Sequence, residues 1–491
     1  MPCRRPLTQN AGCRVKAALP LENSRAKLTA PDPRQVLAAL WRLTDQPEAA
    51  LAGVELTGTE PALPSSFAVG TAAQASVAAA ALAASELWRL RTGRRQSIGV
   101  DMRAAAIEFR SDHYVRVDGK PVAETWDKIA GLYRCGDGRF VRVHTNFAHH
   151  RNGLLALLRC DYDRASVQRA MAGWQAEALE TAAAEAGLVA TATRSFAEWD
   201  AHTQGRAVAG LPLFSIERIG DAPPVPLSAA ERPLAGIRVL DLTRVIAGPV
   251  CGRTLAVHGA DVLTVTAAHL PAMMPLVVDN GRGKLSASLD LREDSARTKL
   301  AALLRQADVF VQGYRPGAIA RHGFGPEELA RIRPGIVCVS LSAYGHVGPW
   351  AGRRGFDSLV QNANGLNMAE AEAAAATEPK PLPTQALDHA TGFLMAFAAM
   401  SALARRATQG GSWHVRVSLA QTGHWFRNLG RIEGLACPDP GLDDVRDRLD
   451  EGSSGFGRLT SVRHAATMSE TPPRWARPSV PLGTHAPEWP R

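Results

Sequence analysis

From residue 234 onward, short apolar runs alternate regularly with segments of helical spacing. The apolar runs begin at Ile237, Gly259, Asp308 and Ile336. Parallel strands need a crossover connection, which is usually a helix, so this alternation predicts a parallel α/β sheet. Ligands of such sheets bind beyond the carboxyl ends of the strands. The loops expected at that edge are residues 244–248, 313–317 and 343–348.

The preceding region has a different, mixed character. An Ala-rich helix is expected over residues 72–91, and a hairpin with its turn at Gly136-Asp-Gly follows. Residues 150–205 have helical spacing, and the Pro-rich stretch 222–233 is the best candidate for a linker. Residues 1–30 are polar, basic and aperiodic, so we expect them to be poorly ordered.

The composition is that of a large soluble protein. A chain of 491 residues corresponds to roughly three domains and can bury a large core without disulfides or metals. With 46% apolar and 21% charged residues it is neither collagen-like, nor wholly disordered, nor a small disulfide-stapled protein. The net charge of +9 favours anionic partners such as phosphates. No basic run has interleaved aromatic residues, so we expect no nucleic-acid partner.

Neither a metal site nor a membrane segment is expected. The seven cysteines form no C-x-x-C pair, and His149-His150 has no third candidate ligand nearby. The most apolar segment, residues 71–87, is interrupted by Gln74 and Glu86 and therefore predicts a buried helix rather than a membrane span. The basic residues at the N-terminus precede no apolar stretch, so we expect no secretory signal and a cytoplasmic protein.

Asp388 opens the apolar helix expected from Phe393 to Leu403. A carboxylate at that position can cap the helix by accepting backbone N–H bonds, and the helix dipole favours its charge. Both effects would hold the carboxylate ionised, as a nucleophile requires. The local pattern leaves two interpretations open, a catalytic carboxylate and a plain capping residue. No G-x-G-x-x-G follows the first strand of this region, which disfavours a dinucleotide cofactor.

Seven motifs of the second half occur in a defined order, although no single one is diagnostic. Together they resemble the family III CoA transferases, which include formyl-CoA and carnitine CoA transferases and the α-methylacyl-CoA racemases. The motifs are Leu234-Ala-Gly-Ile-Arg-Val-Leu-Asp-Leu-Thr-Arg-Val-Ile-Ala-Gly-Pro, Asn280-Gly-Arg-Gly-Lys, Ala307-Asp-Val-Phe-Val-Gln-Gly-Tyr-Arg-Pro-Gly, Arg321-His-Gly-Phe-Gly, Ser342-Ala-Tyr-Gly-His-Val-Gly-Pro, Arg354-Gly-Phe-Asp and Asp388-His-Ala-Thr-Gly.

The resemblance implies an α/β fold with a Rossmann-like parallel sheet in a large domain and a smaller α+β domain. It implies an enzyme that moves CoA from an acyl-CoA thioester to a carboxylic acid, with both as small-molecule substrates and no permanently bound cofactor. The residue that matches the family's nucleophile is Asp388. It would form an aspartyl anhydride and then an aspartyl-CoA thioester.

The same resemblance assigns further site residues. Backbone donors at Ala247 and Gly248 would stabilise an oxyanion, and the basic positions associated with CoA are Lys284, Arg321 and Arg354. Where the family usually reads Val-Ile-Lys-Val-Glu, this chain has Val-Leu-Thr-Val-Thr, so a Lys and a Glu are lost. The replacing residues are Thr264 and Thr266. This departure concerns the CoA contacts and not the fold.

By the same resemblance, the chain looks like two unequal, fused partial copies of the family. The first lacks the opening of the large domain and the second lacks the small domain. The divisions are a partly disordered leader (1–60), a partial copy with a closing helix and small domain (61–232), a Rossmann-like domain (233–434) and a return segment (435–491).

The partial first copy has no visible nucleophile. Thr71 or Ala72 stands at the position of Asp388, depending on a one-residue gap. We expect one active unit to be assembled from both halves, with the Ala-rich helices 72–91 and 390–407 packed side by side. A homodimer and an internal pseudo-dimer both remain open.

Two other functions are compatible with the motifs. An acyl-CoA racemase or isomerase of the same superfamily needs two acid/base groups on opposite faces of the α-carbon. That branch carries a His before the Asp of its Gly-His-Asp motif, whereas this chain has Phe356 there. The other alternative is a catalytically inactive CoA-binding homologue, which the lost Lys and Glu would suit.

Overall fold

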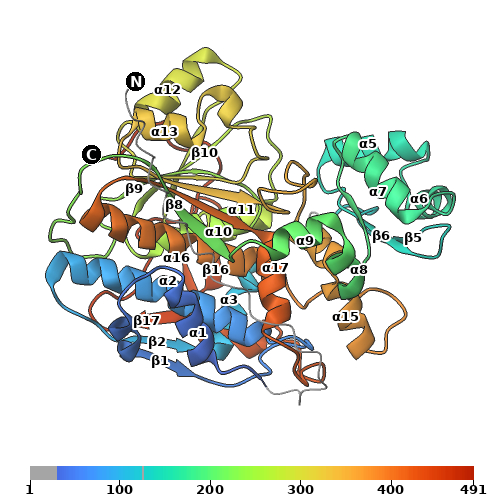
Figure 1. Ribbon diagram of the computed structural model, residues 1–491, viewed down its shortest axis with the longest axis horizontal. Helices are drawn as coiled ribbons and strands as arrows, with labels where there is room; N and C mark the ends of the chain where they lie inside the picture. The colour runs from blue at the N-terminus through green and yellow to red at the C-terminus, as the bar shows by residue number, and fades with distance from the viewer. Residues whose placement is uncertain (1–29, 124–125, 491) are drawn as a thin grey trace, which may run out of the picture.

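A seven-stranded sheet runs through the centre of the computed structural model, which describes residues 30–123 and 126–490 (Figure 1). The strand order is β11-β10-β9-β12-β13-β14-β8, in which the first six strands are parallel and β8 is antiparallel. The predicted parallel α/β sheet is confirmed. The strands are β11 (Lys284–Ser288), β10 (Asp261–Thr266), β9 (Arg238–Leu242), β12 (Val309–Gln312), β13 (Val337–Ser342), β14 (Ser412–Ser418) and β8 (Phe214–Gly220).

Helices cover both faces of this sheet. Alternate residues of a strand point to opposite faces, so Val239 and Val262 pack with α10 and the long helices α2 and α16. Leu240 and Leu263 face the other way, into a second core with α12 and α13 (Figure 1). Burial on both faces explains why the strands are nearly continuous apolar runs. The covering helices are α10 (Ala247–Val257), α12 (Asp294–Leu304) and α13 (Pro326–Ile332).

The two Ala-rich segments form α2 (Val69–Thr92) and α16 (Ala386–Gln409), each 24 residues long. They pack side by side, as predicted, because their small side chains permit a close approach. Helix α16 is long and apolar enough to cross a membrane by composition alone. All of its apolar window is nevertheless buried inside the structure, as in the core helix of a soluble protein.

Each half of the chain donates a strand to a sheet of the other half. Strand β8 precedes the linker yet pairs with β14 of the central sheet. In return, β17 near the C-terminus pairs with β2 in a three-stranded sheet of order β1-β2-β17. Local periodicity did not reveal either pairing. The strands of this smaller sheet are β1 (Val54–Thr57), β2 (Ile98–Asp101) and β17 (Ala466–Met468).

A small lobe, residues 131–192, projects from one side of the molecule (Figure 1). Its three-stranded antiparallel sheet contains the predicted hairpin, with the Gly136-Asp137-Gly138 turn between β5 and β6. Residues 221–233 form neither helix nor strand and are mostly exposed, as a linker should be. The lobe consists of β5 (Gly131–Arg134), β6 (Phe140–Val143), α5 (Ala148–Leu158), α6 (Arg164–Met171), α7 (Ala176–Glu185) and β7 (Ala190–Ala192).

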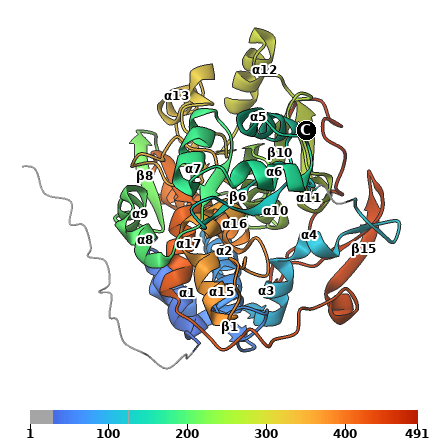
Figure 2. The same ribbon diagram turned by 90° about the vertical axis from the view of Figure 1, so that its right-hand side faces the viewer.

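The expected leader, residues 1–60, lies partly outside the described residues. From residue 33 it is folded, because Asp32 caps α1 (Pro33–Arg42) and Trp41 is fully buried. A hairpin of β15 and β16 projects on another side and extends a sheet with β3 and β4 (Figure 2). The remaining elements are α3 (Met102–Glu108), α4 (Ser111–Tyr114), β3 (Arg116–Val117), β4 (Lys120–Pro121), α8 (Phe196–Ala201), α9 (Thr203–Ala209), α11 (Met274–Asn280), α14 (Asp357–Ala363), α15 (Leu366–Ala373), α17 (Leu419–Asn428), β15 (Leu449–Ser454), β16 (Gly457–Val462) and the short 3-10 helices η1 (Glu48–Gly53), η2 (Ala320–His322) and η3 (Asp443–Arg448).

Candidate active site

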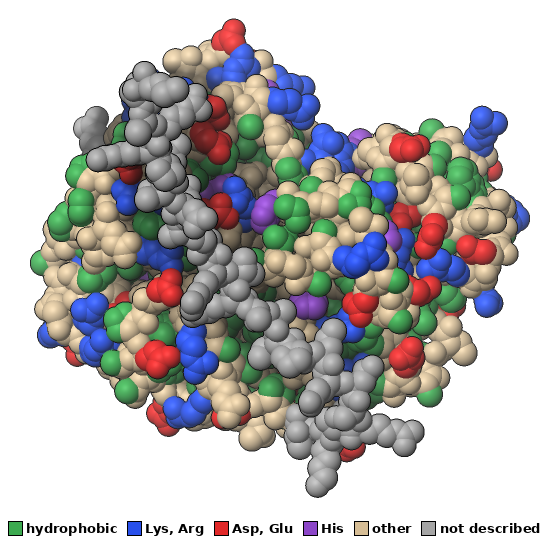
Figure 3. Space-filling view, in the orientation of Figure 1, with side chains coloured by type: hydrophobic (Ala, Val, Ile, Leu, Met, Phe, Trp, Pro, Cys, Tyr) green, Lys and Arg blue, Asp and Glu red, His purple; other side chains and the backbone are tan. Residues whose placement is uncertain are grey.

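The carboxyl edge of the central sheet holds a cavity of about 440 Å³, the central cavity. Its wall combines the loops after β9, β12 and β13 with Asp388 from the head of α16. The small lobe closes it from the other side with Phe147, His149 and His150. Basic and histidine side chains gather at the notch between the lobe and the body (Figure 3). The three loops predicted to meet at this edge therefore line one cavity, which both halves of the chain build.

Asp388 lies in the first turn of α16, and the N-cap of that helix is Gln385. Of the two interpretations left open by the sequence, the plain capping residue is therefore excluded. Burial raises the pKa of the Asp388 carboxyl well above its ordinary value, and the charge of Asp357 raises it further. The N–H of Ala247 offsets these effects only in part. The expectation that local effects hold Asp388 ionised is thus corrected, because a side chain that is 7% exposed feels its burial more than the helix dipole.

Asp357 lies directly behind Asp388. Its Oδ2 accepts the backbone N–H of Asp388 at 2.9 Å, and its Oδ1 accepts the amide of Gln361. Burial raises the pKa of Asp357 to about 6, against those hydrogen bonds. The two carboxyl groups form a buried pair in which the ionisation of one disfavours that of the other.

The first turn of α10 contacts the second turn of α16 closely. Gly392 makes this approach possible, because a Cβ there would lie 2.6 Å from both the carbonyl oxygen of Ala247 and the Cβ of Val250. Gly248 packs against Thr243, and a Cβ on Gly248 would come within 2.3 Å of that side chain. Ala247 lines the central cavity, whereas the role of Gly248 in the structure is close packing.

The loop that leads into α10 is strained. Val245 has a φ of 74°, a left-handed conformation that a β-branched residue rarely adopts. Such strain costs on the order of 1–3 kcal/mol and concentrates at functional sites. Val245 lines both the central cavity and a smaller neighbouring one.

Guanidinium groups dominate the polar wall of the central cavity. Arg354 donates to the carbonyl of Gly187 at 2.7 Å and lies 3.2 Å from His150 Nε2. Burial lowers the pKa of Arg354, and the nearby charges of Arg315 and Arg244 lower it further. Within residues 30–123 and 126–490, none of these three arginines has an ion pair with a carboxylate. The cavity therefore offers uncompensated positive charge to an anionic ligand.

The other two predicted basic residues lie in adjoining cavities. Arg321 is in an outer cavity of about 190 Å³, which shares His269 and Tyr314 with the central cavity. Lys284 lines a side pocket of about 70 Å³, where its ammonium is 2.8 Å from Asp241 Oδ2 and 2.8 Å from the carbonyl of Pro249. The structure thus brings Ala247, Arg354 and Asp388 together but leaves Lys284 in a buried ion pair.

The sequence predicts that the first half contributes to the site, but it does not identify the residues of the small lobe that do so. Phe356 stacks on His144 with ring centroids 3.9 Å apart, and His150 packs edge-on against the same ring. Burial lowers the pKa of His150 to about 3 and that of His144 to about 4. The adjacent pair His149-His150 is the available signal, but without a third ligand nearby it indicates a surface pair rather than a metal site.

Comparison with known proteins gives consistent matches. Residues 234–429 match the family model described as CoA-transferase family III. An acyl-CoA transferase of Gibberella moniliformis is 30% identical over 419 residues, covering 76% of this chain and 73% of that protein. The acetyl-coenzyme A transferase nodX of Hypoxylon pulicicidum is 39% identical over 218 residues, covering 43% of this chain and 37% of that protein.

A probable fatty acyl-CoA transferase of Mycobacterium tuberculosis, Rv3272, is 34% identical over 210 residues, covering 40% of this chain and 52% of that protein. Its crystal structure matches at 32% identity and a TM-score of 0.38, covering 40% of this chain and 56% of that one. The chain thus spans about half or less of two of these relatives and most of the third. The match that extends over most of both sequences, together with the family model, decides the classification. The chain belongs to CoA-transferase family III.

Proposed function

We propose that this protein transfers CoA between an acyl-CoA thioester and a carboxylic acid, with Asp388 as the nucleophile. The observation that carries the proposal is the position of Asp388. It is the carboxyl group of α16 that lines the central cavity, beside the N–H of Ala247 and together with arginines that have no carboxylate partner among the described residues. A carboxylate nucleophile, an oxyanion donor and an anion-binding surface are what such a transfer needs.

The reaction can be written from these groups. The Asp388 carboxylate attacks the thioester carbonyl, the C–S bond breaks, and the CoA thiolate leaves an acyl-aspartyl anhydride. The thiolate then attacks the aspartyl carbonyl and releases the donor acid as its carboxylate. The acceptor carboxylate attacks the resulting aspartyl-CoA thioester, and the thiolate finally takes the acceptor acyl group from the new anhydride. Asp388 is regenerated as a carboxylate.

The adjoining cavities suggest how CoA lies. Its phosphates would contact Arg321 in the outer cavity and Arg315 at its border, and its thioester would reach Asp388 through the central cavity. Arg354 and Arg244 would bind the carboxylate substrate or the developing negative charge. Lys284 is not assigned to CoA binding, because its ammonium already forms an ion pair with Asp241.

Acyl transfer can be tested directly. Purified protein is mixed with acyl-CoA and carboxylate pairs, and new acyl-CoA species are measured by mass spectrometry. Hydroxylamine added during turnover should modify Asp388 in the wild type. Asp388→Asn should abolish both exchange and modification, whereas Asp221→Asn on the 97% exposed linker side chain should change neither. Wild-type exchange rates in Asp388→Asn would contradict the assignment.

Acyl-CoA racemisation is the second candidate. Phe356 removes one expected base, but His149 and His150 line the same cavity as Asp388. An imidazole and a carboxylate on either side of an α-carbon could exchange its proton. Incorporation of deuterium at the α-carbon without acyl exchange would favour this candidate over transfer.

We also propose that both halves form one active unit. The small lobe precedes the linker but closes the cavity that holds Asp388, so an internal pseudo-dimer is favoured over a homodimer. Residues 234–491 expressed alone should therefore be inactive. A soluble, fully active fragment would contradict this arrangement. A cytoplasmic location remains a prediction.

A further inference from the structure

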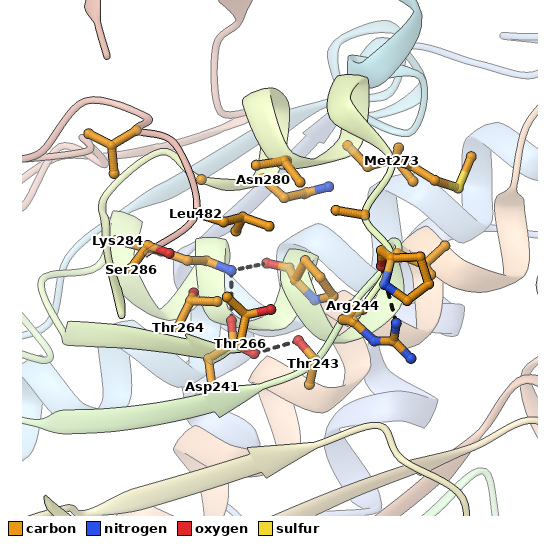
Figure 4. A pocket seen from close by; sticks show the side chains of 18 of the residues that line it. Asp241, Thr243, Arg244, Thr264, Thr266, Met273, Asn280, Lys284, Ser286 and Leu482 are labelled. Carbon is orange, nitrogen blue, oxygen red and sulfur yellow. Dashed lines mark hydrogen bonds and ion pairs between the residues drawn. The ribbon is translucent and has the colours of Figure 1, made fainter. Parts of the chain in front are cut away.

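The side pocket (Figure 4) adjoins the cavity that holds Asp388, which is not among the residues that line the pocket. It has a volume of about 70 Å³ and lies between β10, β11 and α11. Its lining is mostly apolar and includes Met273, Leu276 and Leu482. It shares Phe147, Arg244, Val245 and Pro271 with the central cavity, so the two hollows adjoin at the strained loop. A ligand at Asp388 can therefore extend into it.

Asn280 is a buried polar side chain of this pocket that has no hydrogen-bond partner among the described residues. The side chain is at the end of α11 and the residue is 3% exposed. Neither its Nδ2 nor its Oδ1 has a hydrogen-bond partner among the described residues. A buried amide without partners is unfavourable, so it points to a ligand that both accepts and donates hydrogen bonds.

The charged pair and one serine of the pocket already have partners. Asp241 accepts from Lys284 and from Thr243 (Figure 4). Ser286 Oγ accepts the N–H of Gly483. The Lys284–Asp241 pair is neutral as a whole. A second carboxylate buried beside Asp241 would be repelled, whereas a neutral hydroxyl would meet no charge. The pocket therefore suits an apolar chain with an uncharged polar end.

Short side chains create the space. Thr264 and Thr266 lie on β10 and form part of the wall, where longer side chains would fill the pocket. One water-sized group needs about 10–15 Å³ of such volume. The pocket therefore has room for about five non-hydrogen atoms in a row.

We propose that the side pocket receives the distal end of the substrate's acyl chain, about four carbons long and ending in a hydroxyl group that bonds to Asn280. This inference rests on the proposed acyl transfer and names its substrate class. Arg244 lies at the junction, where its guanidinium donates to the carbonyl of Pro271 at 3.1 Å. It defines the point at which the chain leaves the central cavity.

Binding can be measured without turnover in an Asp388→Asn background. Calorimetry with CoA and with straight-chain acyl-CoAs from acetyl to dodecanoyl gives affinity against chain length. Each methylene that enters the pocket should strengthen binding about fourfold, which corresponds to about 0.8 kcal/mol per buried methylene. The affinity should rise over about four added carbons and then stay constant. At the length where it stops, a terminal hydroxyl should add about fivefold.

Two variants separate shape from hydrogen bonding. Thr264→Leu should end the rise one or two carbons earlier and leave the affinity for free CoA unchanged. Asn280→Leu should keep the chain-length profile but lose the gain from the hydroxyl. Thr298→Leu, on an exposed turn of α12, is the matched control and should change neither.

The outcomes are distinguishable. A flat length profile with normal CoA binding, or a profile that neither variant alters, overturns the pocket assignment and leaves CoA transfer intact. Equal weakening of free CoA by both variants would mean that the pocket holds part of CoA itself, which also overturns the inference. Failure to bind any CoA species contradicts the transferase proposal as well.

Discussion

Helices α2 and α16 have the same backbone and different chemistry. Both are 24 residues long, and their N-caps have nearly equal dihedrals, with φ −75° and ψ 63° at Ala68 against φ −73° and ψ 61° at Gln385. Each is followed by a strand that has a parallel neighbour on one side and an antiparallel neighbour on the other. Counted from the caps, Thr71 corresponds to Asp388, which decides between the two residues that the sequence left open.

The N-terminal turns of α2 and α16 differ in what surrounds them. The Thr71 N–H donates to Glu60 at 2.6 Å, much as the Asp388 N–H donates to Asp357. Around α2, however, the chain covers the helix head, since a Cβ on Gly70 would lie 2.8 Å from both Ala62 and Glu60. The shared backbone supplies the helix terminus, whereas the loops around it decide whether that terminus faces a cavity.

The largest expected effect comes from making the N-terminal turn of α16 resemble that of α2. Asp388→Thr copies Thr71, and Asp388→Asn removes only the charge. Both should lower CoA transfer by about 10³-fold or more, because Asp388 is the one carboxylate among the described residues that line the central cavity. Steady-state acyl exchange measures the loss, and circular dichroism verifies that the fold survives. Activity within tenfold of wild type in both variants would exclude Asp388 as the nucleophile.

Gly392 is the next point of difference, because the corresponding residue of α2 is Ala75. Gly392→Ala should push α16 away from α10, at a cost of about 1–3 kcal/mol in unfolding free energy. It should also move Asp388 relative to Ala247 and reduce exchange by about tenfold or more. Thermal unfolding and kinetics together test this. A stable variant with full activity would show that the close approach is unnecessary for catalysis.

The negative charge of Asp357 raises the pKa of Asp388. Asp357→Asn removes the neighbouring negative charge, so the pKa of Asp388 should fall and the acid limb of the rate profile should move to lower pH. In the native protein the raised pKa of Asp357 makes the folded state bind more protons than the unfolded state between about pH 4 and pH 6. Its contribution to stability therefore falls as pH rises through that range, and the variant should lose this slope.

Glu60→Gln is the control for the pH profile, because it removes the equivalent carboxylate from α2. It should leave the rate profile in place. An equal displacement in both variants would mean that the change reflects altered folding rather than the local field at Asp388.

The smallest effect is expected at the N-terminal turn of α2. Thr71→Val keeps the size of the side chain and should change the free energy of unfolding by about 1 kcal/mol or less. Acyl exchange should be unchanged, which the same assay measures. A large loss of activity would reveal a role for the first-half helix that the comparison does not predict.

Much of the fold could be predicted because its signals are local. The strands of the central sheet are buried on both faces and appear in the sequence as apolar runs. Asp388, which the ordered motifs indicate as the nucleophile, lines the central cavity. The pairing of β8 with β14 could not be found in this way, since it joins segments about 200 residues apart and leaves no periodic signal. The ionisation of Asp388, the ion pair of Lys284 and the approach of His150 depend on what tertiary packing places nearby. Residue type alone does not carry that information.

The exchange of β8 and β17 has a consequence for biosynthesis. The first half leaves the ribosome before its partner strands exist, so β2 lacks β17 and β8 lacks β14 until the second half has been made. Unpaired edges of this kind are exposed to aggregation during synthesis. In the folded protein these two strand pairings join the halves, so the mostly exposed segment 221–233 is not needed to hold them together. A single protease cut in that segment should therefore leave two fragments that migrate as one particle and separate only on denaturation.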